Sequence, residues 1–206
     1  SRLLQQRVKG AGFFKTLLLR RLGSSMEAGR RTITKLLGAN PDVLDDDEDD
    51  DVEEEAILLP GRQASAASDF KNFTPAEMTS LQRCLSLLKE GGNNDPKLDA
   101  LIGYMRGTQP GSQRAWLDLG CILFSQYYDT VRWVGDEMSK RAEFAGIDIG
   151  LYAGSNRSGF WRDGKFQRCD RNVLKGWVRS GEMKLLLGTD AASEGLNLQR
   201  LGTLIN

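Results

Sequence analysis

The segment LLGTDAASEGLNLQ at residues 186–199 changes from apolar to small and polar side chains within a few positions. Lys184 to Leu187 predicts a buried strand, and the turn after it presents the hydroxyl of Thr189. Gly195, further on, allows a backbone to approach a ligand closely. These features indicate either a loop that contacts phosphate or an ordinary turn from a strand to a helix, and both interpretations remain open.

Strands and helices alternate on both sides of this segment. Short apolar runs at Cys121–Phe124 and Ile147–Tyr152 predict two further strands, and Leu204-Ile205 begins a fourth. Apolar residues with helical spacing follow the first two runs, at residues 131–138 and 173–178. This alternation predicts an α/β fold with a parallel sheet and right-handed crossovers.

Parallel sheets of this kind bind ligands at the carboxyl ends of their strands. The candidate residues are therefore those that end or directly follow each strand. They are Ser125 and Gln126 after the first, Tyr152, Ala153, Gly154 and Ser155 at the end of the second, and Gly188, Thr189 and Asp190 at the end of the third.

Helix signals also precede the sheet. The first forty residues predict two basic helices, the second of which starts at a capping box of Ser24 and Glu27. Thr74-Pro75-Ala76-Glu77 predicts another helix start, and Asp95-Pro96 begins a helix that ends at Gly107. We therefore divide the chain into a basic helical segment (1–40), an acidic, low-complexity insertion (41–73) that we expect to be disordered, and a main domain (74–206).

Charge is distributed unevenly along the chain. The 28 Lys and Arg residues balance 28 Asp and Glu residues, but ten of the eleven residues at 45–55 are acidic. Without that run, ten more positive than negative charges remain, which makes a polyanionic partner plausible. The acidic run is typical of a solvated linker, and a second interpretation is that it imitates nucleic acid and docks on the basic helices.

The residue types exclude several classes of function. The chain has no His, which excludes Ser-His-Asp hydrolysis, Cys-His proteolysis and His-ligated zinc within it. Its three Cys residues are isolated, which fits a reducing compartment and no CxxC metal site. No apolar stretch approaches the length that spans a membrane, and no signal peptide opens the sequence, so we expect a cytoplasmic protein. The start without Met and the end in a strand-like run indicate a piece of a longer protein.

The segment GFWRDGKF at residues 159–166 matches a phosphate loop except at its last position. Phe166 stands where a Ser or Thr hydroxyl would hold magnesium, so we do not expect a nucleotide cradle. We predict a surface insertion that either contacts nucleic acid or packs its aromatic side chains locally. The basic residues concerned are Arg157, Arg162, Lys165, Arg168 and Arg171.

Several of these segments together resemble a known family. Residues 186–199 resemble motif V of superfamily-two helicases, in the form found in bacterial Swi/Snf-type ATPases. Cys121 to Tyr127 (CILFSQY) is similar to motif IV of that family, and Leu151 to Ser155 (LYAGS) to its next strand and glycine turn. Arg171 to Trp177 resembles the family's Arg-led helix, and Asp95 to Leu98 the start of its second RecA-like lobe. The resemblance covers residues 95–206 well, the first forty weakly, and the acidic run not at all.

The resemblance implies a RecA-like second lobe that closes with a first lobe on ATP and Mg in the parent protein and moves on double-stranded DNA. Nucleic-acid contacts would come from five residues, and the ATP cleft would include two more. The first set is Ser125, Gln126, Gly154, Ser155 and Thr189, and the second is Gly195 and Asn197. Glu194 has a similar place in the motif, but no role follows for it.

The departures from the family pattern limit what this chain does alone. It has no complete phosphate loop, no acidic Mg-binding motif and no arginine-finger motif, which the family has just beyond Asn206. We therefore expect no catalytic residue, no metal site and no tightly bound cofactor in this sequence. The rival hypothesis is a non-catalytic module with a degenerate RecA-like fold that binds nucleic acid or a protein through its basic helices.

Overall fold

The computed structural model describes residues 15–38, 73–91, 95–112, 114–154, 156–189 and 201–206. The chain divides into two compact units, Ser1–Asn93 and Asn94–Asn206, each of which is described by itself. The second unit holds the sheet, and the helix at residues 75–90 groups with the first unit, whereas the sequence analysis placed it in the main domain. None of the described helices combines the length and the apolar character needed to cross a bilayer.

The first unit contains a helix at residues 15–24, followed by α2 (Met26–Leu36) and α5 (Pro75–Glu90). Ser25, not Ser24, caps α2, because the preceding helix continues through Ser24 and the backbone becomes extended only at Ser25. The Ser25 hydroxyl accepts a hydrogen bond from the Ala28 N–H at 3.0 Å. The predicted capping box of α5 is confirmed, since Thr74 and Glu77 each bond to the other's backbone N–H.

The second unit is a six-stranded sheet with the strand order β4-β3-β2-β5-β1-β6. The four predicted strands are present as β1 (Cys121–Phe124), β2 (Ile149–Tyr152), β5 (Leu185–Gly188) and β6 (Thr203–Ile205), and all four are parallel. The α/β class is therefore confirmed. The expectation of a purely parallel sheet is wrong, because β3 (Gly159–Arg162) runs antiparallel to β2, and β4 (Lys165–Arg168) antiparallel to β3.

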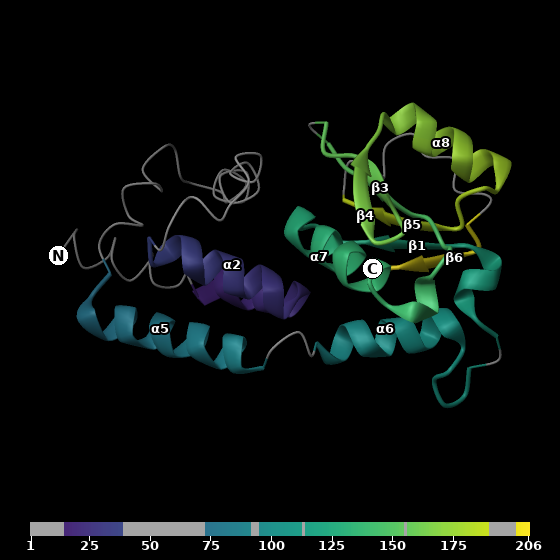
Figure 1. The fold of residues 1–206 in the computed structure, drawn as a ribbon. Helices are drawn as coiled ribbons and strands as arrows, with labels where there is room; N and C mark the ends of the chain where they lie inside the picture. The colour runs from purple at the N-terminus through teal and green to yellow at the C-terminus, as the bar shows by residue number, and fades with distance from the viewer. Residues whose placement is uncertain (1–14, 39–72, 92–94, 113, 155, 190–200) are drawn as a thin grey trace. The chain divides into compact units, whose positions relative to one another are not determined.

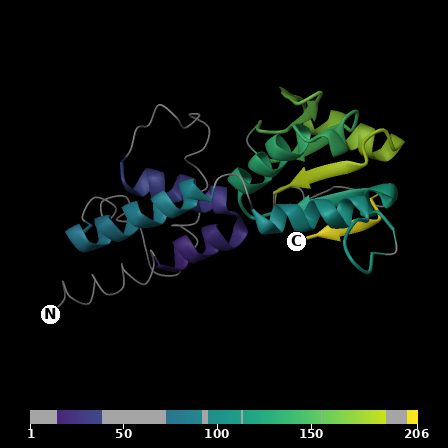
Figure 2. The same ribbon diagram turned by 60° about the horizontal axis from the view of Figure 1, so that its bottom comes forward.

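Helices cover both faces of the sheet (Figure 1; Figure 2). One face packs against α6 (Pro96–Arg106), which ends as predicted at Gly107, and α7 (Tyr128–Ser139), and the other against α8 (Arg171–Ser180). Successive residues of β5 alternate between the two apolar cores, with Leu185 and Leu187 toward α6 and α7 and Leu186 toward α8. The described part of this unit also contains two short 3-10 helices, η2 (Trp116–Leu119) and η3 (Ala142–Phe144).

The predicted surface insertion at residues 159–166 is wrong, because this segment is the β3–β4 hairpin of the sheet. Asp163 and Gly164 form its turn, both with positive φ (51° and 75°), as a two-residue hairpin turn requires. Phe160 and Trp161 are buried on opposite faces of the sheet rather than against each other. The phosphate-loop-like spacing thus results from strand alternation around an Asp-Gly turn.

The hairpin is anchored on α7. The Trp161 indole N–H donates to the Asp136 carboxylate at 2.7 Å, and the indole fills the space left by the missing side chain of Gly135. The Arg132 guanidinium lies 3.8 Å from the centroid of the Phe166 ring and pairs with Asp136 at 3.2 Å. Burial and these polar contacts fix the hairpin to the body of the unit.

Candidate functional site

The carboxyl ends of β2, β5 and β1 lie side by side at one edge of the sheet, which we call the carboxyl edge. Phe124, Gly188 and Tyr152 are paired in register at the ends of these strands. The Ser125 N–H donates to the Gly188 carbonyl at 3.0 Å, and the Thr189 N–H donates to the Tyr152 carbonyl at 3.2 Å. The residues after three neighbouring strands are therefore held together by backbone hydrogen bonds.

Four of the residues assigned to nucleic-acid contact lie at this edge: Ser125, Gln126, Gly154 and Thr189. Gln126 is exposed, and the other three are half-buried. The Ser125 hydroxyl accepts the Tyr127 N–H at 3.2 Å, which orients the chain as it enters α7. Ser155, Gly195, Asn197 and Glu194 lie outside the described residues, and with them the assigned ATP cleft.

The loop after β2 is a tight turn organised by Ser158. Its hydroxyl accepts the Ala153 N–H at 2.9 Å and donates to the Ala153 carbonyl at 2.8 Å. The Arg157 N–H donates to the Gly154 carbonyl at 3.0 Å, and Asn156 takes a positive φ of 57°. This network holds Gly154 at the edge. Sequence reasoning missed Ser158, because a serine at the start of an unrecognised strand carries no distinctive signal.

The hairpin separates the five basic residues that the sequence analysis grouped together. Gly159 pairs with Arg168 and Arg162 with Lys165, so the two ends of the hairpin lie at opposite edges of the sheet. Arg157, Arg168 and Arg171 are at the carboxyl edge, whereas Arg162 and Lys165 are at the opposite, amino edge. Arg162 pairs there with Asp148, its Nε 3.0 Å from Oδ1, which raises the pKa of the guanidinium.

Two of the cations at the carboxyl edge also contact aromatic rings. The Arg157 guanidinium lies 5.0 Å from the centroid of the Tyr128 ring, and Arg157 is only 6% exposed. Arg171 lies over the ring of Tyr152. Both arginines belong to the basic set predicted from sequence, but their tyrosine partners were not predictable, because the contacts join elements that are separate in sequence.

The thiol near the carboxyl edge is a poor nucleophile. Partial burial, and then the adjacent Asp170 carboxylate, raise the pKa of Cys169. Nucleophilic catalysis needs the thiolate, so this environment disfavours covalent chemistry at Cys169. Within the ranges that the structure describes, no three His, Cys, Asp or Glu side chains come together as metal ligands would. The side chains at the carboxyl edge can form hydrogen bonds through hydroxyl and amide groups and can neutralise negative charge through cations.

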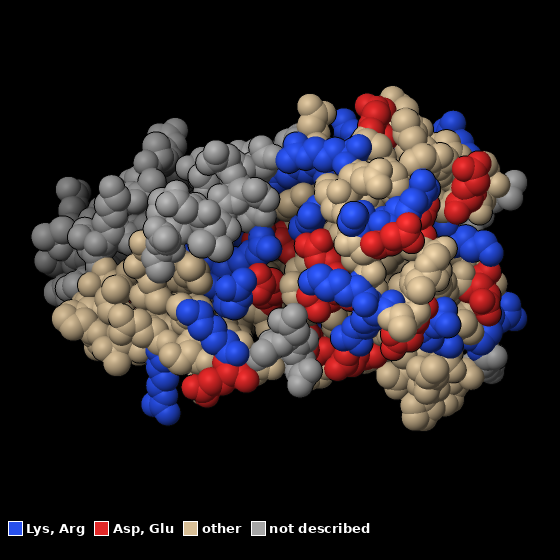
Figure 3. Space-filling view, viewed as in Figure 1, with Lys and Arg blue, Asp and Glu red and all other residues tan. Residues whose placement is uncertain are grey.

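Charge is mixed on the face of the second unit that Figure 3 shows. In Figure 3, basic and acidic side chains are interspersed over the visible face of the second unit, and neither sign covers it. A polyanion would therefore meet local clusters of cations rather than a uniformly basic face.

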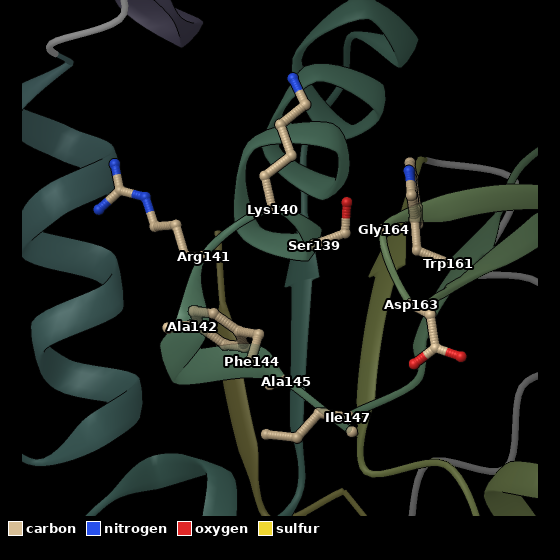
Figure 4. A pocket seen from close by; sticks show the side chains of 11 residues that line it. Ser139, Lys140, Arg141, Ala142, Phe144, Ala145, Ile147, Trp161, Asp163 and Gly164 are labelled. Carbon is tan, nitrogen blue, oxygen red and sulfur yellow. The ribbon is translucent and has the colours of Figure 1, made fainter.

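A cavity of about 270 Å³ lies away from the carboxyl edge, between the end of α7, η3 and the turn of the hairpin. Phe144 and Trp161 form part of its wall (Figure 4). In that view the side chain of Arg141 extends toward α6, where it pairs with Asp99 at 3.1 Å, and Lys140 extends away from the cavity. Asp163 is the acidic residue of the lining, and no residue of the predicted site lines the cavity.

Comparison of the sequence with protein-family models and with curated proteins finds no match.

Proposed function

We propose that this chain is the second RecA-like lobe of an ATP-dependent translocase that moves on double-stranded DNA. The observation that carries the proposal is the carboxyl edge, where three neighbouring parallel strands are followed by Ser125, Gly154 and Thr189. Hydroxyl groups at such an edge suit the oxygens of a phosphate backbone, which they position without reading sequence. The α/β fold and the resemblance of residues 95–206 to Swi/Snf-type ATPases support the same function.

In the parent protein, ATP and Mg would be held between this lobe and a first RecA-like lobe of the same chain. Gly195 and Asn197 would be this lobe's contribution. This lobe's part is to hold DNA backbone at the carboxyl edge while the cleft opens and closes. A protein with this function belongs in the cytoplasm, on the nucleoid.

Thr189→Val tests the edge in this chain, because it removes the hydroxyl and keeps the shape of the side chain. We expect duplex binding, measured by fluorescence anisotropy, to weaken by about 2- to 10-fold, as for the loss of one neutral hydrogen bond of about 0.5–1.5 kcal/mol. The dependence on salt should not change, because no charge is removed. Thr203→Val at the other end of the sheet is the matched control. Equal losses in both variants, or no duplex binding by the unsubstituted chain, would contradict the proposal.

The longer parent provides the second test. There, Thr189→Val should lower DNA-stimulated ATP hydrolysis more than it lowers nucleotide binding. The 206-residue chain alone should not hydrolyse ATP, because one lobe cannot supply both the phosphate cradle and the arginines that stabilise charge in the transition state. Turnover by the purified chain that falls in identically prepared Thr189→Val protein, and so does not come from a contaminant, would show that the chain is a complete enzyme.

A further inference from the structure

Two cations of α8 lie against one aromatic ring at the carboxyl edge. The guanidinium carbon of Arg171 is 5.8 Å and the Nζ of Lys175 is 5.7 Å from the centroid of the Tyr152 ring. Tyr152 is 2% exposed, at the end of β2, so its ring is a fixed platform. Cation–π contact restricts both long side chains before any ligand arrives.

Neither cation has an acidic partner in the described part of the chain. Among the residues that the structure describes, no carboxylate forms an ion pair with Arg171 or Lys175. The nearest carboxylate in sequence, Asp170, caps α8 by accepting the Asn172 N–H at 2.7 Å. Two like charges four residues apart on a helix destabilise it, so this arrangement costs stability unless an anion binds.

The pair is continuous with the strand ends of the proposed DNA site. The Tyr152 carbonyl accepts a hydrogen bond from the Thr189 N–H. Tyr152, whose ring contacts the two cations, is therefore hydrogen-bonded to Thr189. Tyr152 packs in the apolar core beneath α8, with Leu174 and Val178, which places the pair on the α8 side of the edge. Arg179 follows Lys175 by another four residues and is exposed.

We propose that Arg171 and Lys175 bind consecutive phosphates of a DNA backbone that passes from Thr189 onto α8. The proposal rests on the function proposed above and adds a second contact surface to it. Residues four apart rise about 6 Å along a helix, so the row from Arg171 through Lys175 to Arg179 extends about 12 Å. A row of that length suits a polyanion better than one free phosphate. The contacts neutralise charge and are independent of base sequence.

The test is duplex binding by the Arg171→Gln, Lys175→Gln double variant over a series of salt concentrations. Glutamine keeps an apolar stem to pack on Tyr152 and removes the charge. If each cation neutralises one phosphate, the slope of log affinity against log salt should fall in magnitude by about 1.8, and binding at low salt should weaken at least about tenfold. The control is the Lys165→Gln, Lys184→Gln double variant, which removes two exposed charges at the amino edge and should keep the slope.

The outcomes separate this proposal from the function on which it rests. An unchanged slope in the Arg171 and Lys175 variant, with affinity still lost in Thr189→Val, would overturn the cation pair and leave the DNA edge standing. Equal slope changes in both double variants would show that only net charge matters, which also overturns it. Displacement of duplex by inorganic phosphate far beyond that by chloride at equal ionic strength would assign the pair to free phosphate instead. A normal thermal transition in each variant, followed by tryptophan fluorescence, excludes misfolding as the cause.

Discussion

The two edges of the sheet carry the same types of basic residue in different settings. At the amino edge Arg162 pairs with Asp148 and, at the end of α7, Arg141 pairs with Asp99. At the carboxyl edge Arg171 and Lys175 face a tyrosine ring and have no carboxylate partner among the described residues. A cation in an ion pair is neutralised by a carboxylate of the protein. A cation without such a partner can bind an anionic ligand. The setting of a charge, more than its presence, therefore distinguishes the two edges.

The largest effect should come from disrupting the packing of the β3–β4 hairpin against α7. A methyl group at Gly135 would overlap the indole of Trp161, so Gly135→Ala should destabilise the second unit by about 2 kcal/mol or more. All four Trp residues lie in this unit, so urea denaturation followed by tryptophan fluorescence reports on it alone.

Gly176→Ala is the matched control for Gly135→Ala, because Gly176 is also inside a helix but has open space where the methyl group would lie. It should stabilise the unit by about 0.5–1 kcal/mol, through the higher helix propensity of Ala. If both substitutions have the same sign, the packing of Trp161 against Gly135 does not hold the hairpin.

Cysteine labelling should distinguish the edges almost as clearly. Cys121 begins β1 at the amino edge and is fully buried, which raises the pKa of its thiol to about 12. Cys169, near the carboxyl edge, is partly exposed, and its pKa is raised by burial and by Asp170. We expect native-state alkylation at pH 8 to modify Cys169 slowly and Cys121 only after unfolding, as mass spectrometry of peptides would show.

Duplex DNA should slow the alkylation of Cys169 further, because the proposed path onto α8 passes the residue that follows β4. Cys84, in the first unit, provides an internal reference for the reagent. Protection of Cys84 to the same extent as Cys169 would mean that DNA does not prefer the carboxyl edge.

The contrast between the edges was only partly predictable from sequence. Continuous apolar runs such as Cys121–Phe124 predict strands of a parallel core, because burial on both faces removes the need for polar alternation. The order of strands and helices then predicted that Ser125 and Thr189 would follow neighbouring strands. The β3–β4 hairpin was missed because basic residues and aromatic residues alternate in it, which imitates an exposed basic loop. Only tertiary packing against Gly135 shows that Trp161 is buried, and no local pattern predicts the contact of Lys175 with Tyr152.

Acid should weaken the ion pairs that Glu27 forms in the first unit and should leave the carboxyl edge unaffected. Burial alone would raise the pKa of Glu27, but hydrogen bonds from Arg30 and Arg31 lower it below its usual value of 4.5. A lowered pKa in the folded state gives stability above pH 4.5, which is lost as pH falls through the folded value. The protection factors of the α2 amides, which are exchange rates corrected for the intrinsic effect of pH, should therefore fall below about pH 4.5.

Glu27→Gln is the control for this pH effect. It should remove the acid-dependent loss of protection in α2 and cost about 1 kcal/mol at neutral pH. Acid-dependent exchange in α2 that is the same with and without the Glu27 carboxylate would assign the effect to another group.

The smallest effect should come from releasing a paired cation at the amino edge. Asp148→Asn leaves Arg162 without its carboxylate partner and adds one net positive charge to the chain. If any unpaired cation attracted DNA, this variant and its counterpart Asp99→Asn, which releases Arg141, would bind duplex more tightly and with a steeper salt dependence. We expect anisotropy titrations to show neither change, because Arg162 lies at the opposite end of the strands from Thr189. The ring that Arg162 contacts is that of Phe160, not the Tyr152 ring beside Thr189. The expected cost is a small loss of thermal stability, since both pairs are partly exposed and such pairs stabilise little. If the slope of log affinity against log salt steepens in either variant by about 0.9, the value for one more neutralised phosphate, the two edges are equivalent.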